Sequence, residues 1–188
     1  MKYISLVFCS LLLFASCKKD KEDLKEILDV SFQFSTNNLF TLPKVADSVH
    51  NIPDSTITVT TPSIVNTAPD EFKKNKADIN KLKSLTIENV QLTVKTPAGQ
   101  TFAFMKSISI YISATGKPEV LIATKNDINK ISPASGILQL TAQKADISEY
   151  LKGADYKLRI QTALVKTYTN DIAVNCEVKY LAVANPLN

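Results

Sequence analysis

The sequence has no tryptophan, a single histidine and only four glycines among its 188 residues. The glycines lie far apart, so they cannot form the glycine-rich loops that bind nucleotide phosphates. There is also a single arginine, Arg159, and the net charge is only +4. Because arginine supplies the forked donors that favour phosphate recognition, we do not expect nucleic-acid binding.

The single histidine, His50, limits the chemistry open to the chain. Its polar neighbours Asp47, Ser48 and Asp54 are close in sequence, whereas the members of a catalytic triad come from separate elements. We interpret His50 as an exposed loop residue, with an enzyme whose site is unseen as an alternative. One histidine and one cysteine in the domain disfavour zinc. Asp47, Asn51 and Asp54 offer oxygen ligands for calcium, but their spacing matches no known loop, so no metal or other cofactor is predicted.

Cysteine is scarce as well. Cys9 and Cys17 lie in the first residues of the chain, which leaves Cys176 as the only thiol in the rest of the sequence. A lone thiol cannot form an intrachain disulfide, so the domain must fold by core packing alone. Cys176 shares the alternation of Val174 and Val178, which predicts that it packs as a small hydrophobic residue.

The N-terminus has the pattern of an export signal. Lys2 precedes a mostly apolar stretch at 4–14, which is shorter than the roughly 20 residues that a membrane-spanning helix needs. Small residues and a cysteine follow, and Phe14-Ala15-Ser16-Cys17 resembles the lipobox of bacterial lipoproteins. The resemblance implies cleavage before Cys17 and acylation of that cysteine, with an ordinary signal peptide and a chance cysteine as the alternative.

This resemblance divides the chain into a signal at 1–16, a lipidated cysteine with a charged tether at 17–26, and one domain at 27–188. Lipoproteins of this family carry two or three acyl chains, which implies stable anchoring. The charged run at 18–23 is similar to the surface-export signal of Bacteroidota-type lipoproteins, although lysines interrupt its acids. We therefore expect a surface-exposed outer-membrane lipoprotein, with a plain spacer on the periplasmic side as the alternative.

Alternation of apolar and polar residues is the dominant signal in the domain, and it predicts strands with one buried and one wet face. A phase slip at Glu88-Asn89 predicts a β-bulge between Ile87 and Val90. The predicted strands cover residues 30–35, 57–64, 85–94, 101–105, 107–113, 120–124, 137–142, 156–164 and 171–180.

Two short helices are predicted at 69–83 and 145–152. Thr67 is a candidate N-cap of the first helix, and its lysines are interpreted as a solvated face rather than a partner site. The fold class that follows is mostly β, an antiparallel two-sheet sandwich that is immunoglobulin-like or jelly-roll-like, with two short helices.

Two tyrosines are candidates for ligand binding. Tyr111 lies on the serine-bearing face of its predicted strand, and Tyr168 lies at a predicted hairpin tip, where binding residues often occur. Ordinary surface tyrosines are the simpler interpretation. We expect a non-catalytic accessory lipoprotein that contacts an envelope protein, and the alternative is a glycan-binding surface lipoprotein that uses Tyr111 or Tyr168.

Replacing Cys17 with alanine tests the anchor. Because acylation requires the cysteine thiol, antibody labelling of the domain on intact cells should disappear in the Cys17→Ala variant. Lysed cells control for expression. Labelling that appears only after lysis of wild-type cells would contradict surface exposure, and equal membrane retention of the variant would contradict lipidation.

Overall fold

The computed structural model describes residues 29–45, 55–131 and 136–186 of the chain. Cys17, the charged run at 18–23 and the segment around His50 lie outside the described residues. The strands are β1 (Val30–Leu42), β2 (Thr56–Thr60), β3 (Ile64–Val65), β4 (Ala77–Thr96), β5 (Met105–Ala114), β6 (Lys117–Lys125), β7 (Ile137–Ala142), β8 (Asp155–Leu164) and β9 (Ile172–Pro186). Among the described residues, the two α-helices are α2 (Ala68–Lys74) and α3 (Ser148–Lys152), and η1 (Ile128–Lys130) is a single turn of 3-10 helix. No helix in the described ranges is long and apolar enough to cross a membrane.

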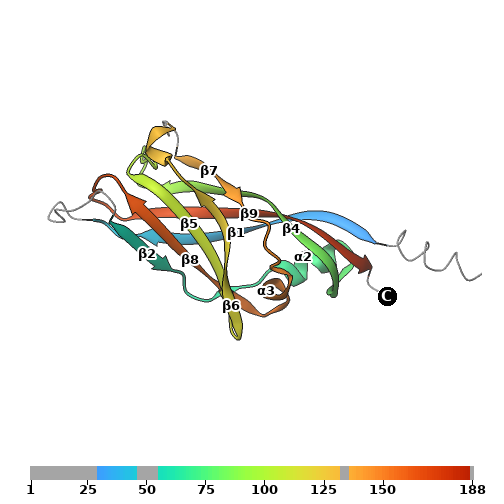
Figure 1. Ribbon diagram of the computed structural model, residues 1–188. Coiled ribbons are helices and arrows are strands. Elements are labelled where there is room, and N and C mark those ends of the chain that lie inside the picture. Colours follow the sequence, from blue (N-terminus) through green and yellow to red (C-terminus); the bar gives the residue numbers. More distant parts are fainter. Residues whose placement is uncertain (1–28, 46–54, 132–135, 187–188) are drawn as a thin grey trace, which may run out of the picture.

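The described strands form one antiparallel sheet in the order β1-β9-β4-β7-β6-β5-β8-β2, with β3 paired to β8. The first half, β1-β9-β4-β7, and the second half, β6-β5-β8-β2, are joined where Ala123 and Thr124 of β6 pair with Ala142 and Thr141 of β7. In Figure 1, β5 and β8 run obliquely across β1, β9 and β4. The prediction of a mostly β, antiparallel fold with two short helices is confirmed. The prediction of two separate sheets is not confirmed, because β7 leaves β4 and continues onto β6.

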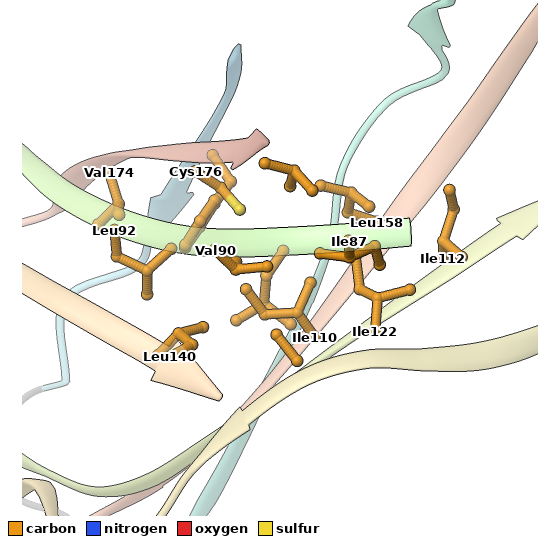
Figure 2. Close-up of a cluster of buried hydrophobic side chains, with 14 of the residues drawn as sticks. Ile87, Val90, Leu92, Ile110, Ile112, Ile122, Leu140, Leu158, Val174 and Cys176 are labelled. Atoms are coloured by element: carbon orange, nitrogen blue, oxygen red, sulfur yellow. The ribbon is translucent and has the colours of Figure 1, made fainter. Parts of the chain in front are cut away.

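The core fills the space between the two halves of this curled sheet. Figure 2 shows apolar side chains of β4 and β9 meeting those of β5, β6, β7 and β8. Cys176 of β9 is fully buried among them, as its alternation predicts. Burial raises the pKa of the Cys176 thiol to about 12, because the charged thiolate loses its hydration. The thiol is therefore protonated at neutral pH and packs as a small hydrophobic group.

The predicted bulge in β4 is confirmed. Ile87 pairs with Tyr180 of β9 and Asn89 pairs with Lys179, so Glu88 is the extra residue on the β4 side. A one-residue slip would turn every later side chain to the opposite face. The bulge prevents this, because Leu85 and Ile87 before it and Val90 and Leu92 after it are all buried.

Strand β1 is longer than predicted and carries two polar residues on its buried face. Asn38 Oδ1 accepts a hydrogen bond from the Tyr156 hydroxyl of β8 at 2.9 Å. Asn38 Nδ2 donates to Thr36 Oγ1 at 3.4 Å, and Thr36 Oγ1 lies 3.4 Å from the hydroxyl oxygen of Tyr180. Burial raises the pKa of both tyrosines. The Asn38–Tyr156 bond joins β1 to the other half of the sheet.

The first predicted helix is half as long as expected. Helix α2 ends at Lys74, and Lys76 adopts the left-handed conformation with φ +55°. Asn75 Nδ2 donates to the carbonyl oxygen of Glu71 at 2.8 Å, which satisfies one carbonyl at the helix end. The chain then pairs with β9, so Leu82 lies opposite Ala184 in β4 rather than on a helix face. Strand pairing has overridden the local helical pattern here.

Thr67 occupies the N-cap position of α2, as predicted, but the side chain that organises both helices is that of the preceding residue, Asn66. Asn66 Oδ1 accepts from the Ala68 N–H at 3.0 Å, and the Thr67 hydroxyl makes no capping bond. Asn66 Nδ2 donates to the carbonyl oxygens of Leu151 at 2.6 Å and Gly153 at 2.7 Å. One buried amide therefore ties the start of α2 to the end of α3, directly before β8 begins.

Three further segments differ from the prediction. Residues 101–104 form turns rather than a strand, and Phe102 and Phe104 are buried. Helix α3 begins at Ser148, where the Ser148 N–H donates to Asp146 Oδ1 at 3.0 Å. The expected strand at 57–64 is interrupted by Pro62 and continues as β3.

Candidate functional site

The outward side of the second sheet half carries polar side chains held in register. Tyr111 of β5 lies opposite Arg159 of β8, and Ser109 lies opposite Gln161. Strand β2 extends this row, because Thr58 lies opposite Gln161 on the other side of β8. We name this surface the outer polar face. Its members are Thr58, Thr60, Ser109, Tyr111, Ser113, Glu119, Thr124, Lys157, Arg159 and Gln161.

Arg159 is the centre of the outer polar face. Its Nε and Nη2 donate to the two carboxylate oxygens of Glu119 at 2.7 and 2.5 Å, and its Nη1 donates to Gln161 Oε1 at 3.1 Å. The guanidinium carbon lies 4.0 Å from the centroid of the Tyr111 ring. This is a bidentate ion pair combined with a cation–π contact, and it holds three side chains in one arrangement.

The opposite charges of Arg159 and Glu119 stabilise each other, and we call these two side chains together with Tyr111 and Gln161 the Tyr111–Arg159 array. The hydrogen bond from Arg159 lowers the pKa of the Glu119 carboxyl, and Glu119 in turn raises the pKa of Arg159. Both side chains remain partly exposed, so the pair is screened by solvent and contributes little to stability. Its consequence is geometric: a fixed aromatic ring with a fixed positive charge above it.

Tyr111 lies on the outer face, as its alternation predicts, and it is half-buried. The structure places Arg159 over its ring, which the sequence did not indicate. A sugar that stacked on that side of the ring would have to displace a guanidinium held by Glu119 and Gln161. A protein surface can instead contact the Tyr111–Arg159 pair as it stands.

The expected exposure of Tyr168 is wrong. Its side chain is buried, and its ring centroid lies 4.4 Å from that of Phe104. Val45, beyond the end of β1, donates its N–H to the Tyr168 carbonyl oxygen at 3.0 Å and so draws this residue into the fold. Among the described residues, the Tyr168 hydroxyl has no hydrogen-bond partner, and burial raises its pKa to about 12. Tyr168 is therefore not available for ligand binding in this conformation.

A groove of about 740 Å³ lies between residues 83–88 of β4 and residues 142–148. Glu88 accepts a hydrogen bond from Gln33 Nε2 at 2.7 Å, and Asp146 accepts the Ser148 N–H. That backbone hydrogen bond lowers the pKa of Asp146. A general acid at neutral pH requires the opposite shift, so Asp146 is not suited to this role.

In the described part of the chain, no group of three His, Cys, Asp or Glu side chains lies close enough together to hold a metal ion. Asp47, Asn51 and Asp54, which the sequence offers as oxygen ligands for calcium, lie outside that part, as does His50. The expectations that they bind no metal and that His50 is an exposed loop residue stay predictions.

Sequence reasoning missed Arg159 and Glu119 as partners of Tyr111. The signal that could have found them is the outward phase of Arg159 in its alternating strand. That phase says which face a residue occupies but not which strand lies beside it. Only the register of β5 against β8 and β6 brings the three side chains together.

Comparison with known proteins does not assign the chain to a family. No family model and no curated protein matches the chain. Among solved structures, it is similar to the decameric BFDV capsid protein, with 9% identity and a TM-score of 0.34 over 84% of this chain and 99% of that chain. It is also similar to a turnip yellow mosaic virus structure, with 10% identity and a TM-score of 0.28 over 84% of each chain. These scores are too low to support a functional argument.

Removing one hydroxyl from each of two buried tyrosines gives a matched test of these contacts. Tyr156→Phe leaves Asn38 Oδ1 without its donor and should lower the free energy of unfolding by about 1–3 kcal/mol. Tyr168→Phe removes an unpartnered hydroxyl and should change stability at pH 7 by less than about 1 kcal/mol, or increase it. Urea denaturation measures both variants.

The Tyr168→Phe variant should also differ from wild type in how its stability depends on pH. The unfolded Tyr168 loses its proton near pH 10, whereas the folded residue keeps it to about pH 12. The unfolded state therefore binds fewer protons in this window, so the free energy of unfolding of the wild type falls as the pH rises from 10 to about 12. Tyr168→Phe should fall less steeply than wild type between pH 10 and 12. An equal loss of stability in the two variants at pH 7 would contradict the assignment.

Proposed function

We propose that this protein is a non-catalytic module of the cell envelope, anchored to the outer membrane by lipid on Cys17, that binds another envelope protein through the outer polar face. The lipobox Phe14-Ala15-Ser16-Cys17 supports the anchor, and the charged run at 18–23 supports presentation at the cell surface. The scarcity of arginine argues against a nucleic-acid partner.

The Tyr111–Arg159 pair is the observation that favours a protein partner. Tyrosine and arginine are enriched at the residues that dominate protein–protein binding energy. Glu119 and Gln161 fix the guanidinium in advance, so less side-chain freedom is lost on binding. The array lies on paired strands rather than on a loop, which makes its geometry precise.

The fold suits a scaffold role. The two halves of the curled sheet enclose one core and leave the outer polar face to solvent, as the two sheets of a sandwich do. On this basis we propose that the domain is a relative of the immunoglobulin-like or jelly-roll-like scaffolds, with its sheets joined along one edge.

Glycan binding through the two tyrosines is less favoured. Tyr168 is buried, and the ring of Tyr111 is covered on one side by Arg159. A glycan panel tested by thermal shift addresses this alternative, because a ligand that binds only the native state raises the unfolding temperature. A shift that Tyr111→Ala abolishes would favour the glycan over the protein partner.

The decisive test is crosslinking in intact cells that express the lipidated chain. Truncating a residue that dominates an interface costs about 2 kcal/mol or more, so Tyr111→Ala should reduce a specific crosslinked species at least about tenfold. Arg159→Ala should do the same. Lys179→Ala, an exposed change on β9 in the other half, is the matched control and should leave that species unchanged.

The test is interpretable only if the variants fold and reach the membrane in equal amounts, which thermal unfolding and quantification of the membrane fraction establish. A crosslinked species that is equally abundant in wild type, Tyr111→Ala and Arg159→Ala would overturn the proposed interface.

A further inference from the structure

A polar hollow of about 350 Å³ opens at one end of the outer polar face, beyond Tyr111. It lies where β5 turns into β6 and where β8 begins. The hollow is lined by Ser63, Ser113, Ala114, Thr115, Asp155 and Lys157.

Three separate elements hold these side chains in place. Lys157 of β8 lies opposite Ser113 of β5. On the other side of β8, Ile64 of β3 pairs with Tyr156, which brings the preceding Ser63 to the hollow. Thr115 stands in the turn between β5 and β6, where Gly116 adopts φ +71°. The lining therefore comes from paired strands and a tight turn.

The start of β8 is fixed as well. Asn66 Nδ2 donates to the carbonyl oxygen of Gly153, and the Asn66 N–H donates to the Ala154 carbonyl oxygen at 2.9 Å. Asp155 follows directly and lies opposite Val65 of β3. The carboxylate of Asp155 is thus carried by a backbone that is anchored to β3 and to Asn66, which follows β3.

The polar groups of the hollow are not used by the fold. Within the described chain, the side chains of Ser63, Ser113, Thr115, Asp155 and Lys157 make no hydrogen bond or ion pair with one another or with any neighbour. Asp155 and Lys157 are two residues apart on one strand and still do not pair. Arg159 and Glu119 next to them are fully engaged, so the hollow differs from the surface beside it.

The chemistry of the lining selects a class of ligand. Three hydroxyl groups can donate and accept, a carboxylate accepts, and an ammonium group donates. The two opposite charges balance, so a neutral ligand is favoured over an ion. A volume of about 350 Å³ lies at the lower end of the range for small-molecule sites, and the lining contains one apolar residue, Ala114.

We propose that this hollow binds one neutral sugar unit, with Asp155 accepting hydrogen bonds from its hydroxyl groups and Lys157 donating to a sugar oxygen. The serine and threonine hydroxyls complete the ring of partners. The inference goes beyond the proposed protein contact and does not depend on it. Ser113 and Lys157 belong to the outer polar face as well, but Tyr111, Arg159 and Glu119, on which the protein contact is argued, do not line the hollow.

Binding is measured on the full lipidated chain in micelles of a detergent without a sugar head group. The probes are glucose, galactose, mannose and N-acetylglucosamine, examined by saturation-transfer NMR and by titration calorimetry. For a ligand of this size we expect a dissociation constant of about one millimolar for at least one sugar.

Matched variants locate the site. Asp155→Asn should weaken binding at least about tenfold, because a charge-assisted hydrogen bond is lost. Asp127→Asn makes the same change at an exposed carboxylate that pairs with Lys130, and should leave binding unchanged. Ser113→Ala should also weaken binding, whereas Ser109→Ala on the same strand face should not.

Each remaining outcome decides against the proposal. Absence of saturation transfer from all four sugars would overturn it. Equal binding to wild type and Asp155→Asn would also overturn it, because the sugar would then bind elsewhere. Tyr111→Ala separates the two proposals: sugar binding should survive this change even where the protein crosslink is lost.

Discussion

Strand β9 pairs over its length with β1 on one side and with β4 on the other, and the rest of the fold is built on these two ladders. Its inward residues alternate without a break from Ile172 to Ala184 and are all buried. Within the described residues no disulfide holds this arrangement, since Cys176 is the only cysteine there and is itself a core residue with a free thiol. Hydrophobic burial against the opposite half must therefore supply the stability.

The bulge at Glu88 allows the long β4 strand to serve two purposes. Before the bulge, β4 pairs with β9 while its other edge borders a groove, and after the bulge it also pairs with β7. Strand β7 then passes to β6, which carries the sheet around the core. This curl places β8 between β5 and β2 in the second half, with neighbours on both sides. The side chains on its outer face are consequently held in fixed register.

The proposed function depends on this fixed register of the strands. Arg159 on β8 reaches over the ring of Tyr111 on β5 to Glu119 on β6 because three strands hold their register, not because of any local sequence motif. Lys157, one step earlier on the same face of β8, belongs to the polar hollow. One strand therefore presents two adjacent surfaces of different chemistry, one that we propose binds a protein and one that we propose binds a sugar.

Alternation made most of the fold predictable from the sequence, including the bulge at Glu88 and the buried state of Cys176. The prediction from alternation failed where a polar residue occupies a core position, as Thr36 and Asn38 do in β1. A pattern of hydropathy assigns such a residue to the exposed face, although its hydrogen bonds allow it to be buried. It failed again where tertiary contacts overrode local preference. Pairing with β9 converted the second half of a predicted helix into β4, and Val45 drew Tyr168 into the fold.

The candidate site was less predictable than the fold. The sequence indicated that Tyr111 and Arg159 face outward, but their contact depends on strand order, which a single sequence does not encode locally. The polar hollow depends on the same information, since Ser63, Ser113 and Asp155 are far apart in the chain and meet only through the pairing of β8 with β3 and β5.

The central claim is that the outer polar face is covered by a partner in the envelope. Hydroxyl-radical footprinting of native membranes and of the purified chain tests it most directly. The oxidation of Tyr111 is measured relative to that of Leu39, whose side chain is 68% exposed on β1 in the other half. The account predicts that this ratio is severalfold lower in native membranes than in the purified protein. An unchanged ratio would mean that the outer polar face is free in the envelope and would contradict the account.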